Sequence, residues 1–265
     1  MSKVSRIAAV GDNCMDVYEN IGEAYPGGNP VNVAVYTMRL GHSASYIGVV
    51  GTDCYGKRMI DSIQAKGVDI SHVKIKEGNT AVTYVKLING NRELGDYEEG
   101  VMAEFALTTE DIRFICEHDM LVTGIWGMIE NELPRISEKG IPIAFDFATR
   151  WKSEKLNLML PYVDYAFFSA EELTEEILDL MKAAKSKGPK IVIVTLGENG
   201  SIAYSGDEFI RYGIVPCEVK DTMGAGDSYI AGFITGILEG KTIYECMKQG
   251  ALNSSITLQY MGAWG

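Results

Sequence analysis

An apolar stripe late in the chain gives the strongest helical pattern in the sequence. Its members recur three and four residues apart and are Ile230, Phe233, Ile234, Ile237 and Leu238. This spacing places them on one face of an α-helix. Gly240 stands where a C-terminal cap is expected, so the pattern predicts a helix that begins near Gly224.

Before this helix, short apolar runs alternate with helical patterns. The runs that have the composition of buried strands cover residues 7–10, 45–50, 120–123, 141–147, 164–168 and 190–195. The other predicted helices include residues 51–66, a capped helix that starts at 107–111, 171–187 and 243–258. Strands that alternate with helices predict an α/β fold with a doubly wound, mostly parallel sheet. With no internal repeat or linker, residues 1–265 are expected to form a single domain.

Two further segments have the pattern of strands in a smaller sheet. Residues 80–87 alternate between apolar and polar side chains, a hairpin turn is predicted at 89–91, and the chain returns from residue 92. Residues 13–25 are also strand-like. Strands inserted at about 13–25 and 79–97 therefore predict a small sheet that projects from the main domain.

One more helix is predicted over residues 29–40. Gly27 and Gly28 form a turn, and Asn29 followed by Pro30 suits an N-cap and a first helical position. Most of the side chains that follow are apolar, so the helix is expected to be buried. The amides of Asn29 and Asn32 then need hydrogen-bond partners, for which the local backbone is one source.

The composition limits the class of protein. With 265 residues and 46% hydrophobic side chains, the chain is long enough to bury the core of one globular enzyme. A formal net charge of −12 at pH 7, with no basic run, argues against a nucleic-acid partner. No segment resembles a membrane span or a targeting signal, and the five scattered cysteines fit reduced thiols, so a cytoplasmic protein is expected.

The start of the helix at Gly224 has the features of an anion site. The first N–H groups of a helix lack internal partners and carry partial positive charge. Gly224, Ala225 and Gly226 leave these groups open to close approach, and the carboxylate of Asp227 lies beside them. An anion hole next to a carboxylate suits phosphoryl transfer to a hydroxyl group, whose proton the carboxylate takes. The alternative is a tight turn in which Asp227 only stabilises the helix.

Two other carboxylates follow predicted strands. Asp12 comes directly after the strand at 7–10, and ligands of open α/β sheets bind at such strand ends, although Asp12 could also cap a turn. Asp146 lies near the end of the strand at 141–147 and could face the same site or a solvated turn.

Two segments resemble the signatures of a known family. Residues 221–229 (DTMGAGDSY) resemble the C-terminal signature of the ribokinase-like, or PfkB, carbohydrate kinases, and residues 27–34 (GGNPVNVA) resemble the N-terminal signature. They occur in the order found in the family, and the resemblance covers essentially the whole chain. It implies a ribokinase-like fold, a lid formed by the small sheet, and a kinase that uses ATP and Mg²⁺.

The resemblance also implies roles for individual residues. Asp227 matches the base that takes the proton of the acceptor hydroxyl. The anion hole is matched by Gly224, Ala225 and Gly226. The residues that match the family's ligands of sugar hydroxyls are Asp12, Gly28, Asn29 and Asn32.

The nucleotide and metal sites are implied in the same way. The turn that resembles the family's nucleotide loop contains Thr195, Gly197 and Gly200. Asn253 is expected to border the adenine pocket. Asp221 and Thr222 match a loop that in many relatives holds a monovalent cation, usually K⁺. Glu172 keeps the acidic position of the family's magnesium motif, but Ser169 stands where the family has Asn, which puts a metal role for Glu172 in doubt.

Several stretches resemble the family members that phosphorylate the 6-hydroxyl of a fructosamine such as fructoselysine. They are residues 11–14, 95–103, 125–127 and 259–264. Within the second stretch, Asp96, Glu98 or Glu99 could meet the ammonium group of a lysine-bearing sugar, or all three could be solvated. A lid in this family often leads to dimers, so a homo-oligomer is expected.

Other functions stay open at this point. The chain could be another kinase of the same family, acting on fructose, ribose or a nucleoside, because the motifs read substrate choice poorly. The chain could also be a regulator that binds a sugar or a nucleotide and has lost catalytic activity. A dinucleotide-dependent oxidoreductase is disfavoured because no Gly-x-Gly-x-x-Gly pattern follows the first strand.

Overall fold

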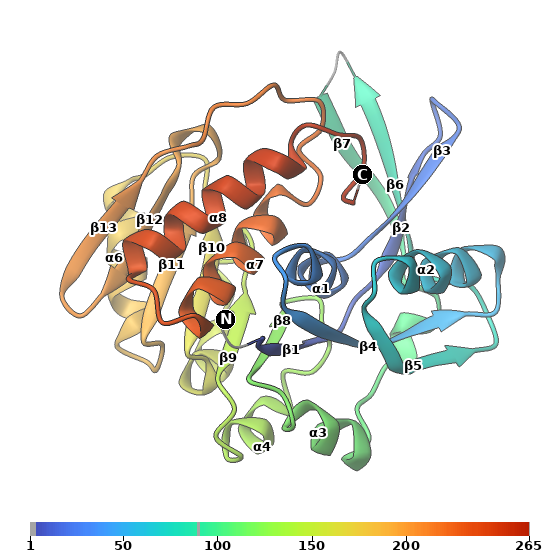
Figure 1. The fold of residues 1–265 in the computed structure, drawn as a ribbon, viewed down its shortest axis with the longest axis horizontal. Helices are drawn as coiled ribbons and strands as arrows, with labels where there is room; N and C mark the ends of the chain where they lie inside the picture. Colours follow the sequence, from blue (N-terminus) through green and yellow to red (C-terminus); the bar gives the residue numbers. More distant parts are fainter. Residues whose placement is uncertain (1–3, 89–90, 265) are drawn as a thin grey trace.

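A nine-stranded sheet forms the centre of the molecule, which a computed structural model describes over residues 4–88 and 91–264 (Figure 1). Its strand order is β13-β12-β11-β10-β9-β8-β1-β4-β5. The strands are β1 Arg6–Val10, β4 Ser43–Gly51, β5 Asp69–Lys76, β8 Met120–Gly124, β9 Ile143–Asp146, β10 Tyr165–Ser169, β11 Ile191–Thr195, β12 Ser201–Ser205 and β13 Glu208–Tyr212. Neighbouring strands from β5 to β11 pair in parallel, whereas β12 and β13 pair antiparallel at one edge. The doubly wound, mostly parallel sheet is thus confirmed.

Helices cover both faces of this sheet. The helices are α1 Asn29–Arg39, α2 Cys54–Ala65, α3 Thr109–Ile115, α4 Leu133–Ser137, α5 Leu156–Met159, α6 Glu175–Lys185, α7 Ala225–Leu238 and α8 Ile243–Thr257. Side chains of α1, α2, α7 and α8 pack in the clusters that contain Ile7 and Ala9 of β1, while those of α3 to α6 pack in the cluster that contains Ala8 and Val10. Because both faces are buried, the central strands are apolar throughout rather than alternating.

The course of the chain creates a switch point in the sheet. From β1 the chain adds β4 and β5 on one side, and it then adds β8 to β11 on the other side. The loops that follow β1 and β8 therefore diverge at the carboxyl ends of adjacent strands, which is where open α/β sheets bind ligands. Asp12 follows β1, Gly124 ends β8, and Asp146 ends β9 at the same edge.

A four-stranded sheet stands apart from the large one, to the upper right in Figure 1. Its order is β3-β2-β6-β7, and its strands are β2 Cys14–Tyr18, β3 Glu23–Gly27, β6 Val82–Ile88 and β7 Asn91–Glu98. These strands come from the two segments predicted for the small sheet. The predicted hairpin turn between β6 and β7 includes residues 89–90, which lie outside the described residues. β5 and β13 were not predicted from the sequence.

Local signals explain most helix boundaries. α3 starts with a capping box in which Thr108 and Asp111 exchange hydrogen bonds, as its sequence predicts. α1 starts one residue earlier than predicted, because Gly28 is the N-cap and Asn29 is the first helical residue. α6 starts later than predicted, because Thr174 caps it through a bond from the backbone N–H of Ile177. Within the described residues, no helix has the length and apolarity to cross a membrane.

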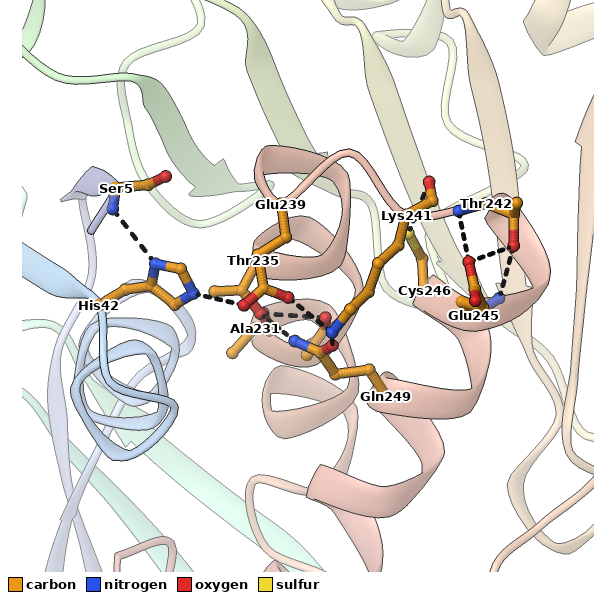
Figure 2. A network of polar contacts seen from close by, with 11 residues as sticks. Ser5, His42, Ala231, Thr235, Glu239, Lys241, Thr242, Glu245, Cys246 and Gln249 are labelled. Carbon is orange, nitrogen blue, oxygen red and sulfur yellow. Dashed lines mark hydrogen bonds and ion pairs between the residues drawn. The ribbon is translucent and has the colours of Figure 1, made fainter. Parts of the chain in front are cut away.

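A polar network fixes the C-terminal end of α7 to its neighbours (Figure 2). The buried hydroxyl of Thr235 accepts a hydrogen bond from Gln249 Nε2 of α8 at 2.9 Å. One turn further on, Glu239 Oε1 lies 3.3 Å from His42 Nε2, and His42 Nδ1 accepts from the backbone N–H of Ser5 at 3.2 Å. These contacts tie the C-terminal end of α7 to α8 and to the residues beside β1 and β4.

Candidate active site

The N-terminus of α7 is open to solvent at the switch point. Gly224 is its N-cap in the left-handed conformation with φ of 71°, and a Cβ added there would lie 2.2 Å from the hydroxyl oxygen of Tyr36. A Cβ added at Gly226, in contrast, would meet no atom within 4 Å. Gly226 is exposed and Asp227 follows it in the first helical turn. Because a Cβ on a helix leans toward the N-terminus, the free space at Gly226 lies on the side of the predicted anion hole.

Asn29 contacts three carboxyl groups at this point. Its side-chain Nδ2 donates to Asp227 Oδ1 at 2.7 Å and to Asp146 Oδ2 at 2.9 Å. Its backbone N–H donates to Asp12 Oδ2 at 3.2 Å. Asn29 thus brings together Asp12, Asp146 and Asp227, which lie far apart in the sequence. Asp146 faces the site rather than a solvated turn.

A second amide holds the other oxygen of Asp227. Asn32, one turn further along α1 and 3% exposed, donates from Nδ2 to Asp227 Oδ2 at 2.7 Å. The Oδ1 of Asn32 accepts from the indole Nε1 of Trp264 at 2.6 Å. Each carboxylate oxygen of Asp227 therefore accepts one amide hydrogen, and the carboxylate is fixed in one orientation.

Two buried oxygen atoms next to these groups lack a partner. Asp12 Oδ1 and Asn29 Oδ1 accept no hydrogen bond from any of the described residues. Leaving a buried acceptor unpaired costs about 1–3 kcal/mol. Both atoms can accept hydrogen bonds from hydroxyl groups, so the site offers two acceptors to a polyhydroxylated ligand beside the Asp227 carboxylate.

The carboxyl groups of the site resist ionisation. Burial raises the pKa of Asp227 from 3.8 to about 6, against the opposing effect of the Asn32 and Asn29 hydrogen bonds. Burial likewise raises the pKa of Asp12 to about 6. For Asp146, burial and then the nearby charge of Asp227 raise the pKa to about 7. A carboxylate with a pKa close to neutral is a stronger proton acceptor than an ordinary aspartate.

Gly28 makes a close backbone contact. It has a φ of 115°, and a Cβ added there would lie 2.6 Å from Asn13 Cα and 2.8 Å from the carbonyl oxygen of Asp12. The glycine lets the start of α1 lie against the backbone that follows β1. This packing alone requires glycine, and it also brings Asn29 and Asp12 within hydrogen-bond distance.

The predicted nucleotide loop follows β11. Gly197 and Gly200 have φ of 55° and 83°, so this turn needs residues that adopt the left-handed region. The hydroxyl of Thr195 lies 2.8 Å from that of Ser169, the residue that stands in place of the family's Asn. Asn199 Nδ2 donates to the backbone carbonyl that precedes Glu172 at 3.4 Å, so the loops after β10 and β11 lie together.

The residues predicted to bind metal ions are Glu172, Asp221 and Thr222. Glu172 is exposed and lines a surface pocket with Asn199 and Tyr212. Asp221 is buried, and its oxygens accept from the backbone N–H groups of Met223 and Gly262 at 3.0 and 2.9 Å. Thr222, next to it, is exposed.

Asn253 uses its whole amide inside the protein. Its Oδ1 accepts from Arg39 Nη2 at 2.7 Å, and its Nδ2 donates to the carbonyl oxygen of Ser228 at 2.8 Å. The side chain is 1% exposed. These bonds fix α8 against α1 and α7, and a contact between Asn253 and adenine stays a prediction.

The acidic stretch of the small sheet lies at one end of β7. Tyr97 pairs with Thr83 of β6 and is 51% exposed. Burial and then the acidic groups of Cys14, Asp12 and Glu99 raise the pKa of the Tyr97 hydroxyl, which therefore lies within electrostatic range of Asp12. The neighbouring Glu98 accepts from the Tyr84 hydroxyl at 3.3 Å, and alternation along a strand puts it on the opposite face from Tyr97.

Asp96 lies at an irregularity in the strand pairing, unlike Tyr97 and Glu98. It lies where the pairing of β6 and β7 shifts register, between the Thr83 and Val85 positions, and it is exposed. Glu99 follows the end of β7, is also exposed, and is the acidic residue of this stretch whose charge acts on Tyr97.

Comparisons with known proteins fit this geometry. The sequence matches the profile described as pfkB family carbohydrate kinase over residues 7–264. The chain belongs to the pfkB family of carbohydrate kinases. Among curated members of the family, it is 46% identical over 258 residues to fructoselysine 6-kinase of Shigella flexneri, which covers 97% of this chain and 99% of that protein. It is 36% identical to fructosamine kinase FrlD of Bacillus subtilis, over 98% of this chain and 93% of that one.

Solved structures of the pfkB type share the fold. Ribokinase of Arabidopsis thaliana, in complex with ribose and ATP, superposes with a TM-score of 0.87 over 99% of this chain and 95% of that chain, at 21% sequence identity. At this identity the likeness establishes the ribokinase-like fold. The predicted small sheet beside a large, helix-covered sheet is part of this likeness.

Turnover by this kinase is expected to fall as the pH drops below about 6. A carboxylate must be ionised to accept a proton, and the folded pKa of Asp227 is raised from 3.8 to about 6, so the active form is lost as the pH falls through that value. The stability effect has the opposite sign. Because the raised pKa makes the folded chain hold this proton more tightly, its contribution to the free energy of unfolding is fully present below about pH 3.8 and is lost as the pH rises through about 6.

The measurement is a profile of kcat/KM against pH, with unfolding in urea followed at the same pH values. A profile that stays flat to well below pH 6 would show that Asp227 is not the group whose ionisation limits turnover. The matched variant for the unfolding series is Asp227→Asn, whose stability relative to the unmodified protein is expected to increase as the pH rises.

Proposed function

We propose that this kinase transfers the γ-phosphoryl group of ATP to the 6-hydroxyl of a fructosamine, with fructoselysine as its preferred acceptor. The observation that carries the chemistry is the Asp227 carboxylate, held by two amides beside an open helix N-terminus. The identity to fructoselysine 6-kinase of Shigella flexneri over nearly the full length of both chains supports the choice of acceptor.

The unpaired oxygens of the site would bind the sugar. Asp12 Oδ1 and Asn29 Oδ1 would accept hydrogen bonds from its hydroxyl groups, which places the reacting hydroxyl beside Asp227. Asp227 takes the proton as the hydroxyl oxygen forms its bond to the γ-phosphorus. The bond from the γ-phosphorus to the β–γ bridging oxygen breaks, and ADP leaves. The N–H groups around Gly224, Ala225 and Gly226 stabilise the charge on the transferred group.

The adenine of ATP would lie on an apolar face of α8. Leu252 and Ile256 lie one turn apart on this helix and are 44% and 49% exposed. Ser254, on the other side of the same helical turn, donates from its hydroxyl to the carbonyl oxygen of Ala225 at 2.7 Å, so this turn of α8 lies next to the predicted anion hole. The phosphates would extend from there to the start of α7, past the turn with Thr195, Gly197 and Gly200.

Magnesium would arrive with the nucleotide. Among the described residues, no three His, Cys, Asp or Glu side chains are grouped to hold a metal ion. This fits Mg²⁺ bound to a nucleotide, because phosphates and water supply most of its ligands and one or two carboxylates suffice. Glu172 would supply such a carboxylate, and Mg²⁺ would neutralise phosphate charge. A monovalent cation at Asp221 and Thr222 stays a prediction, as does a dimer formed through the small sheet.

The amine of a fructosamine would be recognised at the end of β7. A fructosamine carries a protonated secondary amine on C1, and fructoselysine adds the charged groups of the lysine. Glu99, exposed beside Tyr97, would attract the positive charge, and Asp96 is the second candidate. The ring of Tyr97 would cover the sugar on the side of the lid.

We expect a kcat/KM at least 100-fold higher for fructoselysine than for fructose, which corresponds to about 2.7 kcal/mol in the transition state. The reason is that plain fructose has no cation to pair with the acidic groups of the lid. The measurement is ADP release with Mg²⁺ and ATP, for fructoselysine, fructose and ribose in parallel. Variants Glu99→Gln and Asp96→Asn identify the group that carries the preference, with Glu98→Gln on the other face as the matched control.

Each alternative gives a different result in this assay. Equal or faster turnover of fructose or ribose would keep the kinase mechanism and reject the fructosamine assignment. Binding of ATP and of sugar without turnover of any acceptor would identify a regulator that has lost catalysis. The ordered pair of amides on Asp227 argues against such a loss.

A further inference from the structure

The segment from Tyr260 to Trp264 packs directly onto the active site. The hydroxyl of Tyr36 on α1 donates to the carbonyl oxygen of Ala263, and the backbone N–H of Gly262 donates to Asp221 Oδ2 at 2.9 Å. Trp264 is partly buried and packs against two of the core clusters. This segment, which we call the strap (Tyr260–Trp264), therefore has a fixed position relative to α1.

The strap brings one donor to the amide that holds the catalytic base. Trp264 Nε1 donates to Asn32 Oδ1 at 2.6 Å, and Asn32 Nδ2 donates to Asp227 Oδ2 at 2.7 Å. The Asn32 side chain is 3% exposed, so water does not compensate for a lost partner. The indole, the amide and the carboxylate form one chain of hydrogen bonds with a single direction.

Only one orientation of the Asn32 amide is compatible with this chain. If the amide turned over, its NH₂ group would face the indole N–H, and its oxygen would face the carboxylate of Asp227. Two donors would then oppose each other at one end and two acceptors at the other. An indole has no acceptor with which to adapt, so its N–H selects the orientation that presents a donor to Asp227.

We propose that Trp264 is a positioning residue for phosphoryl transfer: its indole N–H orients Asn32, and through Asn32 it fixes the catalytic carboxylate of Asp227. This inference rests on the proposed role of Asp227 as the base. The hydrogen bond of the Trp264 indole goes to Asn32 rather than to Asp227. Its effect reaches the reaction through the hydrogen bond that Asn32 makes to Asp227.

The other groups around Asp227 do not duplicate this role. Asn29 binds the opposite oxygen and is oriented by Asp146 rather than by the strap. Asp12 and Asp146 are acidic, and their direct effect on Asp227 is repulsion between like charges. Loss of the Asn32 bond would therefore leave Asp227 with one amide donor and a carboxylate that is harder to ionise.

The test replaces the donor and keeps the shape of the side chain. In the full-length enzyme, Trp264→Phe removes the N–H group. A second variant carries at position 264 the benzothiophene analogue of tryptophan, which keeps the two fused rings and replaces the N–H by sulfur. Lys66→Ala is the matched control, because it removes the Lys66 contact to the backbone carbonyl of Trp264 (3.1 Å) and leaves the indole unchanged.

Both position-264 variants are expected to lower kcat about tenfold, with the KM for ATP unchanged, and to shift the acid limb of the kcat/KM profile upward by about half a pH unit. Lys66→Ala should stay within about twofold of the unmodified enzyme. A benzothiophene variant with normal kcat and an unmoved acid limb would overturn the proposal. Each variant is compared with the unmodified enzyme on the sugar that the unmodified enzyme turns over fastest. If that sugar is not a fructosamine, the proposed function fails, but the comparison still tests the role of Trp264.

Discussion

Replacing Asp227 with asparagine is expected to lower kcat by about 10³-fold. The amide has nearly the shape of the carboxylate but cannot accept the proton of the sugar hydroxyl. Sugar and ATP binding should persist, because Asp12, Asn29 and the N-terminus of α7 do not need the charge at position 227. The measurement is steady-state ADP release together with binding of each substrate by calorimetry.

The folded state should tolerate this change. Burial disfavours the ionised form of Asp227, so removing the charge relieves a cost that offsets the loss of one amide hydrogen bond. Asp179→Asn, which makes the same substitution on the exposed surface of α6, is the control and should leave kcat unchanged. If Asp227→Asn kept kcat within about tenfold of normal, Asp227 would not be the base.

Substituting Gly226 is expected to lower kcat by about 10²-fold without destabilising the protein. A Cβ at this position meets no atom within 4 Å, so alanine fits without moving a neighbour, and Gly226 is exposed, so the methyl groups of valine can extend into solvent. The added carbon atoms would occupy the space in front of the first N–H groups of α7, where the transferred phosphoryl group needs to lie. We expect a graded loss from Gly226→Ala to Gly226→Val, measured as kcat with saturating sugar.

The same variants should unfold at equal or higher urea concentration. Replacing a helical glycine by alanine stabilises a protein by about 0.4–1 kcal/mol where the backbone allows it. Gly224→Ala is the contrasting variant, because its Cβ would lie 2.2 Å from the Tyr36 hydroxyl and it should lose both stability and activity. Full activity in Gly226→Val would place the phosphoryl group elsewhere.

Local patterns were sufficient to predict most of the fold. The stripe that begins at Ile230 identified α7, and the apolar runs identified the central parallel strands. β5 was missed, because its sequence between Asp69 and Lys76 mixes polar and apolar residues without regular alternation, at an edge of the sheet, and lacks an apolar run. β13 is also an edge strand with a weak pattern.

The candidate site was predicted only in part, because its contacts join residues that are far apart in the sequence. Single motifs located Asp227 and the amides of α1, but their partners come from distant segments. Asp146 could not be distinguished from a turn residue, because its role depends on the orientation of Asn29 across the sheet. The shift of the α1 N-cap from Asn29 to Gly28 has the same origin, since the Asn29 side chain binds carboxylates instead of capping its own helix.

The position of the first hairpin of the small sheet links recognition to access. β2 begins at Cys14, two residues after Asp12, and β3 ends at Gly27, two residues before Asn29. Each end of this hairpin is therefore next to one of the two site residues with an unpaired oxygen, Asp12 and Asn29. A sugar bound by Asp12 and Asn29 would therefore also fix both ends of this hairpin, so sugar binding and the positioning of the small sheet over the site would occur together. The catalytic centre would be completed only when the sugar is bound, and this order would protect ATP from hydrolysis by water.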